Sequence, residues 1–581
     1  MKRTESNESL LQQFVDNNFK SDFEFREYQK EVILDILNKY DEDPKGVYLL
    51  NAPTGSGKSI IAICVAGVLS YKSKSGYLLA SDLALQNQYE NDINRLNLDW
   101  GSVKGVDNYI CDVNFEKHSL GECKIKNLKN KEIQDLPCYE TCGYFSNRNK
   151  AIKSQVSLLN YSYWLIQRNY VAPRMPEYAE VPFGVRHFTI CDEGHKITKI
   201  VQNHFSPRIT EKTRPKLEEL RTFVKNEFNK DIKVNPDELK RVISKLHKSE
   251  NKFEIYKLIS EFVGMLTRFL IIVEPIKEEI ATDYEGVQLP KGLIKGMRLF
   301  DWVKDLHCKF EDYEEIINNT NEDVIIKNSN KNGIVFNCID ESYLMGKYFH
   351  KQTGFTLIMS ATLGGKNKFT KAIDAPAGTV TYYDMPSRFD YTKSPIFLYL
   401  KRKMTYREKE KNFPWVFSTI EKIMEFHKNE RGIIHTGSYE NSKRIYEALP
   451  GKYRNRLLHY SDSEEKKQIL DEISERNNTV LIGPSLLEGL DLKNDLSRFQ
   501  IFAKVPFPSL ADKYVSEKMK VDKDWYDWET VIGILQGLGR SVRTKDDHAI
   551  TYFLDGSLYN LISRNRTGFP SDFYDRLKYV K

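Results

Sequence analysis

A glycine-rich stretch between two apolar segments constrains this chain more than any other feature. The stretch runs from Ala52 to Ser59 and reads Ala-Pro-Thr-Gly-Ser-Gly-Lys-Ser. Apolar residues 47–50 before it predict a buried strand, and apolar residues 60–69 after it predict a buried helix. A glycine loop between a strand and a helix binds nucleotide phosphates through its backbone N–H groups and the positive end of the helix. We therefore predict a nucleotide site, although Ala52 stands where the general pattern has its first glycine.

The residue types of this loop indicate how it would hold ATP and Mg²⁺. Lys58 can reach the β- and γ-phosphates, and the hydroxyl of Ser59 can bind Mg²⁺. The backbone of the loop supplies the remaining phosphate contacts. The predicted loop ligands of ATP are Thr54, Gly55, Ser56, Gly57, Lys58 and Ser59.

An acidic segment follows a second predicted strand. Apolar residues 188–191 lead directly into Asp192 and Glu193, which precede Gly194 and His195. Carboxylates at the C-terminal end of a parallel strand lie beside the phosphate loop in such folds. We predict that Asp192 holds Mg²⁺ and that Glu193 orients or deprotonates the attacking water, because phosphoryl transfer depends on positioning and charge neutralisation. The alternative is that Asp192 only caps the following helical turn.

A third motif lies near the C-terminus, where Gln536 is followed by Arg540 and Arg543. The two arginines are three residues apart and would share one face of a helix. Two guanidinium groups on one face suit the charge that develops on a γ-phosphate. By itself the motif also fits an exposed basic turn.

These three motifs, in this order, resemble those of superfamily 2 helicases of the DEAH-box type. The match extends from residue ~25 to residue ~555, and the acidic box has Gly194 where the family has alanine. The resemblance implies that Arg26 and Gln29 contact the nucleotide base, and that Gly489 and Asp491 belong to the nucleotide site. It implies that His195, Ser360 and Thr362 couple hydrolysis to movement.

Four of the eight cysteines fall within 32 residues, at Cys111, Cys123, Cys138 and Cys142. Four thiolates suit either a zinc ion or an iron–sulfur cluster. Zinc sites commonly show two tight pairs, whereas only Cys138 and Cys142 form one here. The spacing therefore favours a cluster and leaves zinc open. The other four cysteines, such as Cys64 and Cys191, fit small buried hydrophobic residues.

The position of the four cysteines resembles that in the XPD/DinG-type helicases, which carry a [4Fe–4S] domain there. The segment 104–111, Lys-Gly-Val-Asp-Asn-Tyr-Ile-Cys, and the segment 160–163, Asn-Tyr-Ser-Tyr, are similar to elements of that family. The resemblance implies a [4Fe–4S] cluster held by the four thiolates. It also implies a pore for single-stranded DNA, where Tyr161, Tyr163 and Trp164 would stack bases or else belong to the core.

The fold class predicted for the chain is α/β, with two RecA-like domains of parallel sheets flanked by helices. Charged, helically periodic residues 211–319 resemble the arch domain of the family, with a helix start at Pro236, and asparagine-rich residues 318–332 predict a loop. The predicted divisions are a first motor domain in three parts (1–104, 151–205 and 336–385), an iron–sulfur domain (105–150), a helical insertion (206–335) and a second motor domain (386–581).

The resulting prediction is an ATP-dependent DNA helicase or single-strand translocase, with ATP, Mg²⁺ and a [4Fe–4S] cluster as cofactors. Family resemblance implies 5′→3′ movement on single-stranded, forked or tailed DNA by a monomer. A scaffold switched by ATP, an RNA motor and a nuclease-linked motor are the alternatives. The net charge of +6 is compatible with nucleic acid without indicating it. No apolar run approaches the ~20 residues that span a membrane and no secretory signal is visible, which predicts an intracellular protein, cytoplasmic in a prokaryote or phage and nuclear in a eukaryote.

Overall fold

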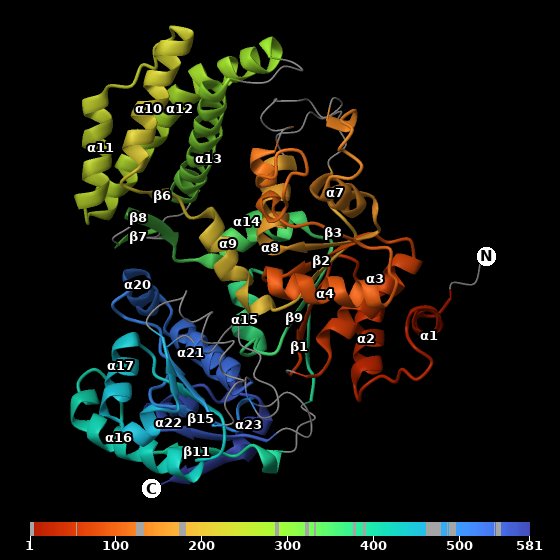
Figure 1. The fold of residues 1–581 in the computed structure, drawn as a ribbon, viewed down its shortest axis with the longest axis vertical. Helices are drawn as coiled ribbons and strands as arrows, with labels where there is room; N and C mark the ends of the chain where they lie inside the picture. The colour runs from red at the N-terminus through yellow and green to blue at the C-terminus, as the bar shows by residue number, and fades with distance from the viewer. Residues whose placement is uncertain are drawn as a thin grey trace.

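Two parallel sheets organise the chain in the computed structural model (Figure 1). The structure describes residues 5–53, 55–121, 123, 133–172, 182–284, 290–319, 325–330, 333–375, 379–386, 391–460, 478–484, 486, 496–539, 541 and 548–580.

The first sheet has seven parallel strands in the described residues, in the order β10-β1-β9-β5-β2-β4-β3. Strand β1 lies between β9 and β10, and β5 lies between β9 and β2. The phosphate loop, which follows β1, and the acidic segment, which follows β5, therefore leave the sheet on either side of β9, at the carboxyl ends of the strands. The strands are β1 (Val47–Asn51), β2 (Gly76–Ala80), β3 (Gly101–Ser102), β4 (Val156–Asn160), β5 (Phe188–Cys191), β9 (Phe355–Ser360) and β10 (Val380–Asp384).

Helices cover both faces of this sheet because its strands are apolar on both sides. One face packs on the helices α1 to α4 and the other on helices that follow β4, β5, β8 and β9. The first group is α1 (Asn7–Asn18), α2 (Gln29–Glu42), α3 (Lys58–Tyr71) and α4 (Leu83–Arg95). The second group is α8 (Tyr161–Ile166), α9 (Ile197–Phe205), α14 (Glu341–Tyr348) and α15 (Lys366–Ala372), while α7 (Gly143–Lys153) follows the cysteines.

The second sheet also has seven parallel strands in the part of the chain that is described, in the order β13-β14-β12-β15-β16-β11-β17. Its strands are β11 (Ile396–Tyr399), β12 (Gly432–His435), β13 (Leu457–His459), β14 (Val480–Gly483), β15 (Phe499–Phe502), β16 (Ile550–Phe553) and β17 (Leu577–Val580). Its helices are α16 (Lys409–Phe426), α17 (Tyr439–Ala448), α18 (Gly451–Arg454), α20 (Lys513–Val521), α21 (Lys523–Leu538), α22 (Ser557–Arg564) and α23 (Ser571–Arg576). The predicted pair of parallel-sheet α/β domains is confirmed.

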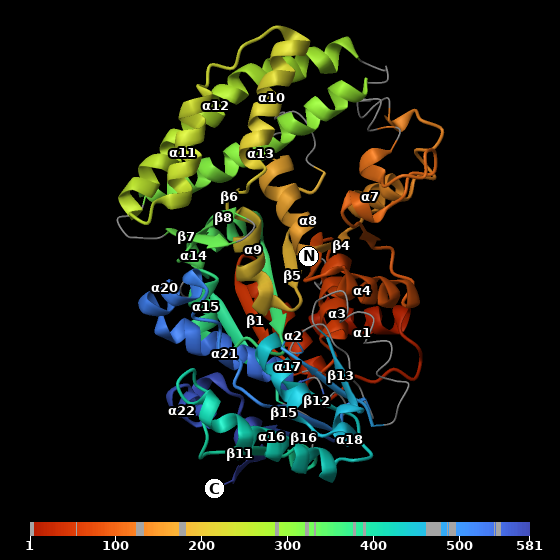
Figure 2. The same ribbon diagram turned by 60° about the vertical axis from the view of Figure 1, so that its left-hand side comes forward.

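A helical unit projects from the first domain, and its Glu250 forms an ion pair with Lys513 of α20 in the second domain (Figures 1 and 2). It consists of α10 (Thr213–Phe228), α11 (Pro236–Lys248), α12 (Lys252–Asp283) and α13 (Lys291–Asn319). Helix α11 begins at Pro236, as the sequence predicts, and the side chain of Asn235 caps it. The segment around α7 projects from the same end of the first domain (Figure 2).

A small antiparallel sheet, β6-β8-β7, forms the base of the helical unit. Its strands are β6 (Arg208–Ile209), β7 (Ile325–Asn330) and β8 (Gly333–Cys338). The prediction of a loop over residues 318–332 is therefore wrong for residues 325–330, which form β7. The asparagines indicated a loop, but the side chains of Ile325 and Ile326 are buried and pair with β8, and this burial outweighs the local preference.

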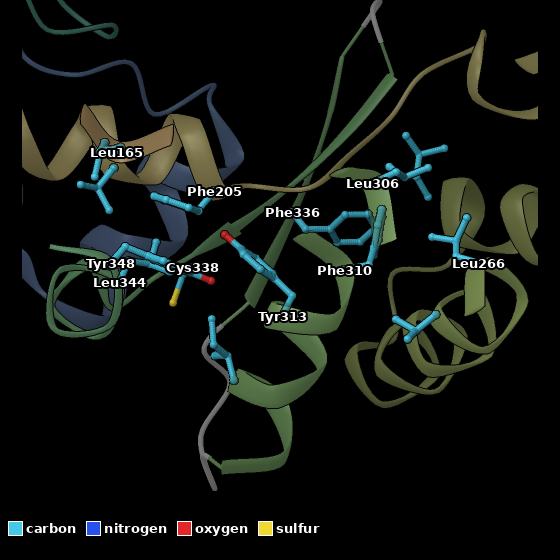
Figure 3. Packing of buried hydrophobic residues seen from close by; sticks show 14 of the residues in the cluster. Leu165, Phe205, Leu266, Leu306, Phe310, Tyr313, Phe336, Cys338, Leu344 and Tyr348 are labelled. Carbon is cyan, nitrogen blue, oxygen red and sulfur yellow. The ribbon is translucent and has the colours of Figure 1, made fainter. Parts of the chain in front are cut away.

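One continuous core joins the helical unit to the first domain (Figure 3). Phe205 of α9 stacks on Tyr348 of α14, with ring centroids 3.7 Å apart. Phe310 of α13 packs edge-on against Phe336 of β8 and continues this core towards α12. The helical unit therefore rests on the first domain through buried aromatic contacts.

Candidate functional site: a nucleotide cleft and a cysteine cavity

The phosphate loop connects β1 to α3 in the arrangement that the sequence predicts. Gly55 and Gly57 have φ angles of 77° and 81°, which favour glycine. Lys58 donates from Nζ to the carbonyl oxygen of Ala52 at 3.3 Å, so its side chain lies across the loop. Ala52 is fully buried and its N–H continues the pairing with β9 at Ser360. This position therefore extends the strand, which explains why alanine can replace the glycine of the general pattern.

Arg26 and Gln29 form hydrogen bonds to the backbone of the phosphate loop. The resemblance places both residues at the nucleotide base. Gln29 donates from Nε2 to the carbonyl oxygen of Ser56 at 2.7 Å, and Arg26 donates from Nη1 to that of Gly55. A Cβ at Gly57 would lie 2.2 Å from Nε2 of Gln29. The two side chains therefore fix the loop backbone, and the close approach of Gln29 requires glycine at position 57.

The acidic pair lies at the end of β5, where Asp192 is almost completely buried. Tyr89 donates from its hydroxyl to Oδ2 of Asp192 at 2.8 Å, and the N–H of Glu193 donates to Oδ1 at 2.8 Å. Burial and the neighbouring Glu193 carboxylate raise the pKa of Asp192 above its usual range, against the lowering effect of Lys58. The carboxylate of Asp192 is thus oriented by two donors beside a lysine. The hydroxyl of Ser59 and this carboxylate are oxygen donors, which Mg²⁺ prefers.

The packing around Gly194 explains why the acidic box has glycine here, where the family pattern has alanine. A Cβ at this position would lie 2.2 Å from Cγ2 of Ile358 on β9. The neighbouring strand therefore occupies the space that an alanine side chain would need. Glu193 has a φ of 52°, so the backbone turns sharply where the strand ends.

His195 connects the acidic segment to two other motifs. Its Nδ1 lies 2.7 Å from Oγ of Ser360, and its Nε2 lies 2.6 Å from Nε2 of Gln536 in the last turn of α21. The Glu193 carboxylate lies 3.3 Å from Nδ1. His195 thus contacts β9 of the first sheet and α21 of the second domain at once.

The segment after β9 carries Thr362 and reaches the second domain. Oγ of Ser360 accepts a hydrogen bond from the backbone N–H of Thr362 at 3.0 Å. The next residue, Leu363, accepts at its carbonyl oxygen from Nε1 of Trp528 at 3.0 Å. Ser360 and Thr362 therefore lie between His195 and the contact that α21 makes through Trp528.

All four clustered cysteines line one cavity next to α7. Cys111, Cys123 and Cys142 are buried and Cys138 is partly exposed. The cavity is narrow and partly open to solvent. Burial, with the nearby Cys142 and Cys111 thiols, raises the pKa of the Cys138 thiol. In the described part of the chain, no three His, Cys, Asp or Glu side chains are grouped around a point where one metal ion would bind.

His118 also lines this cavity and is buried. Its Nε2 lies 3.3 Å from Sγ of Cys142, and its ring packs against Tyr144 and Phe145. The sequence analysis missed this residue, because a histidine between cysteines carries no ligand signal without a fixed spacing.

Several predicted site residues lie outside the described residues. They are Thr54, Gly489, Asp491, Arg540 and Arg543. Their roles stay predictions.

The aromatic residues considered for base stacking belong to the core. Tyr161, Tyr163 and Trp164 are all buried, and Tyr161 donates to the carbonyl oxygen of Asp192 at 2.9 Å. The core alternative for these residues is therefore confirmed. The sequence analysis also missed Tyr89 and Trp528, whose contacts join segments 103 and 165 residues apart.

A phosphate loop, an acidic strand end and a second parallel-sheet domain that contacts the acidic segment through Gln536 give the chain a two-domain fold of the P-loop class. Two family models match this chain. One is described as "Type III restriction enzyme, res subunit" and matches residues 22–217, and the other is described as "Helicase C-terminal domain" and matches residues 420–572. They fall on the first and second parallel-sheet domains.

Known proteins resemble the chain in sequence over part of its length and in fold over nearly all of it. The "Probable ATP-dependent helicase YpvA" of Bacillus subtilis (strain 168) is 24% identical over 217 residues, which are 36% of this chain and 32% of that protein. The match thus spans about a third of the length of this relative.

"Structure of S. tokodaii Xpd4" superposes with a TM-score of 0.59 at 14% identity, and "XPD_Helicase" with 0.58 at 16%; each comparison covers 96% of this chain and 100% of the other. The family models thus match the two parallel-sheet domains separately, and the chain as a whole shares the fold of the two solved XPD structures. No helix in the described ranges is long and apolar enough to cross a membrane.

Proposed function

We propose that this chain is an ATP-driven DNA helicase or single-strand translocase that moves in the 5′→3′ direction as a monomer. The observation that carries the proposal is the contact of His195 with both Ser360 and Gln536. A nucleotide site whose acidic segment touches the second domain can convert a change at the γ-phosphate into a change between domains. The proposal includes the division of the chain into two motor domains, an iron–sulfur domain and a helical insertion at the boundaries predicted from the sequence.

Hydrolysis in this proposal uses residues from both domains. Lys58 binds the β- and γ-phosphates, while Ser59 and Asp192 hold Mg²⁺, which neutralises phosphate charge. Glu193 orients a water molecule, whose oxygen attacks the γ-phosphorus as the bond to the β-phosphate oxygen breaks. The proton of that water passes to Glu193 or to phosphate, and ADP and inorganic phosphate leave. Arg540 and Arg543 would stabilise the charge on the transferring group.

Coupling in this proposal runs through the neutral ring of His195. The amide nitrogen of Gln536 is a donor, so Nε2 of His195 accepts and the ring proton lies on Nδ1, facing Ser360. Loss of the γ-phosphate would move Glu193 and with it the ring. Ser360 and Gln536 would then transmit that movement to the segment around Thr362 and to α21.

The proposal assigns a [4Fe–4S] cluster to Cys111, Cys123, Cys138 and Cys142, which line a common cavity. A zinc ion requires four sulfur atoms about 2.3 Å from one point. A cluster binds each thiolate through a different iron, so it suits thiols that surround a cavity without converging on one point. When bound, the cluster supplies a covalent link between the two ends of the segment from Cys111 to Cys142.

The decisive experiment is strand separation with anaerobically purified protein, ATP and Mg²⁺, on matched duplexes with a 5′ or a 3′ single-stranded tail. We expect unwinding from the 5′ tail, and none with Lys58→Ala. Lys45→Ala, an exposed lysine just before the same strand, is the matched control.

Unwinding from the 3′ tail alone would support the proposed helicase activity and refute the proposed 5′→3′ direction. Activity on RNA duplexes alone would refute DNA as the substrate. Nucleotide binding without hydrolysis would favour an ATP-switched scaffold.

A further inference from the structure

Tyr89 makes a buried contact with the proposed magnesium site that no sequence motif assigns. It lies on α4, its side chain is fully buried, and its hydroxyl donates to Oδ2 of Asp192 at 2.8 Å. Its ring packs in the core between α4 and the first sheet. A phenol is therefore held rigidly against the carboxylate that would bind the metal.

The contacts of Asp192 leave room for a metal ion. Tyr89 occupies Oδ2 and the N–H of Glu193 occupies Oδ1, while Tyr161 holds the main-chain oxygen. A carboxylate has about four lone-pair sites, so about two remain for Mg²⁺ or for its bound waters. The two donors fix the rotation of the carboxylate without saturating it.

The turn of α4 that carries Tyr89 is itself anchored on both sides. Gln86 donates from Nε2 to the carbonyl oxygen of Val103 at 3.0 Å, and Glu90 forms an ion pair with Lys104 at 2.7 Å. The Nε2 of Gln88 lies 3.5 Å from Oγ of Ser59. One turn of helix therefore faces both oxygen donors of the proposed metal site and is braced by the segment that leads to the cysteines.

We propose that Tyr89 is a positioning residue that orients Asp192 for Mg²⁺. The inference rests on the proposed function, because it takes Asp192 as a ligand of the metal bound with ATP. Removing a partner that orients a metal ligand lowers the affinity for the metal by about 10–100-fold. The hydroxyl does not touch the substrate, so its effect falls on metal binding and leaves the chemical step intact once metal is saturating.

The test uses Tyr89→Phe in the full-length protein and measures Mn²⁺ binding by electron paramagnetic resonance, in the presence of a non-hydrolysable ATP analogue. We expect the Mn²⁺ dissociation constant to rise by about 10–100-fold. In ATP hydrolysis, the concentration of Mg²⁺ needed for half-maximal rate rises in parallel, whereas kcat at saturating Mg²⁺ is retained. Unchanged Mn²⁺ binding in a folded Tyr89→Phe protein would overturn the inference.

Tyr48→Phe is the matched control. Tyr48 is also fully buried in the first domain, and its hydroxyl also donates to a carboxylate, Oδ2 of Asp35 at 2.6 Å. The control loses a comparable hydrogen bond away from the nucleotide and keeps wild-type Mn²⁺ binding. An equal loss in both variants would assign the effect to general destabilisation and overturn the inference.

Asp192→Asn separates this inference from the function on which it rests. If Asp192→Asn leaves Mn²⁺ binding unchanged, then Asp192 is not a metal ligand and the proposed site itself fails. If Asp192→Asn weakens Mn²⁺ binding and Tyr89→Phe does not, the site stands and only the role of Tyr89 is refuted.

Discussion

Nε2 of Gln536 lies 2.6 Å from Nε2 of His195, and this pair joins the last turn of α21 to the acidic segment of the first domain. The two residues are 341 positions apart in the chain. Their contact places the second domain against the same histidine that faces Ser360.

Gln536→Ala is expected to separate hydrolysis from movement. The variant loses one hydrogen bond, worth ~1 kcal/mol, and the His195 ring loses its donor from the second domain. We expect strand separation to fall by about fivefold, while the affinity for ATP stays unchanged. The measurement compares unwinding rate with ATP turnover in the same preparation. Equal losses in both quantities would contradict a coupling role and indicate a role in the chemistry.

Gly194→Ala is expected to destabilise the protein through Ile358. The added methyl would overlap Cγ2 of Ile358, and overpacking of this kind costs about 1–3 kcal/mol. In the background of Ile358→Ala, the same change should cost almost nothing, because the space is then free. Thermal midpoints of the four proteins in this cycle test the interaction. An equal cost in both backgrounds would show that the contact with Ile358 is not the cause.

Removing one partner of the ion pair between Lys518 of α20 and Glu341 of α14 is expected to destabilise the protein strongly. Nζ lies 3.0 Å from Oε1, and the side chains are 6% and 9% exposed. Lys518→Met leaves the Glu341 charge buried without its ion pair, which costs about 3–5 kcal/mol. The double variant Lys518→Met/Glu341→Leu should recover most of that loss, because both charges are then absent.

The control for this prediction is an exposed ion pair. Arg444 and Glu410 lie 2.8 Å apart, with side chains 31% and 64% exposed. Arg444→Met should cost only about 0–1 kcal/mol, because water screens the pair. Similar thermal shifts for Lys518→Met and Arg444→Met would refute the importance of burial at the α20 contact.

The sequence predicts a structural feature when the residues that form it lie close together along the chain. The phosphate loop lies between β1 and α3 as predicted, because apolar strand, glycine turn and apolar helix are adjacent in sequence. The contact between Tyr89 and Asp192 was not predicted, since a tyrosine on an amphipathic helix carries no sign of its partner 103 residues away. Residues 325–330 were predicted as a loop because pairing with β8 is a tertiary effect. The sequence thus predicts chemistry where it is local and misses the partners that orient it.

Acidification is expected to destabilise the protein through His204 on α9. Burial, with Lys309 nearby and Asp305 in partial opposition, lowers the pKa of His204 to about 4 from 6.5. Above pH 6.5 the ring is neutral in both the folded and the unfolded chain, so it adds no pH dependence. Below pH 6.5 the unfolded chain binds a proton that the folded protein accepts only near pH 4. Unfolding is therefore favoured by about 1.4 kcal/mol per pH unit in this window.

His204→Gln should flatten the dependence of the thermal midpoint on pH between 6.5 and 4. The exposed His548 provides the matched control, and His548→Gln should leave that dependence unchanged. A His204→Gln protein with the same pH dependence as wild type would show that other groups control acid unfolding.

Cys138→Ser is expected to remove iron from the protein. Cys138 lines the cavity with Cys111, Cys123 and Cys142, and a cluster depends on all four thiolates. We expect iron per protein to fall to a small fraction of the wild-type value, with loss of visible absorbance. Cys308→Ser serves as the control because that cysteine lies on α13, away from the cavity, and should keep the iron. A wild-type protein that binds zinc and no iron after anaerobic purification would refute the cluster and restore the zinc alternative that the cysteine spacing left open.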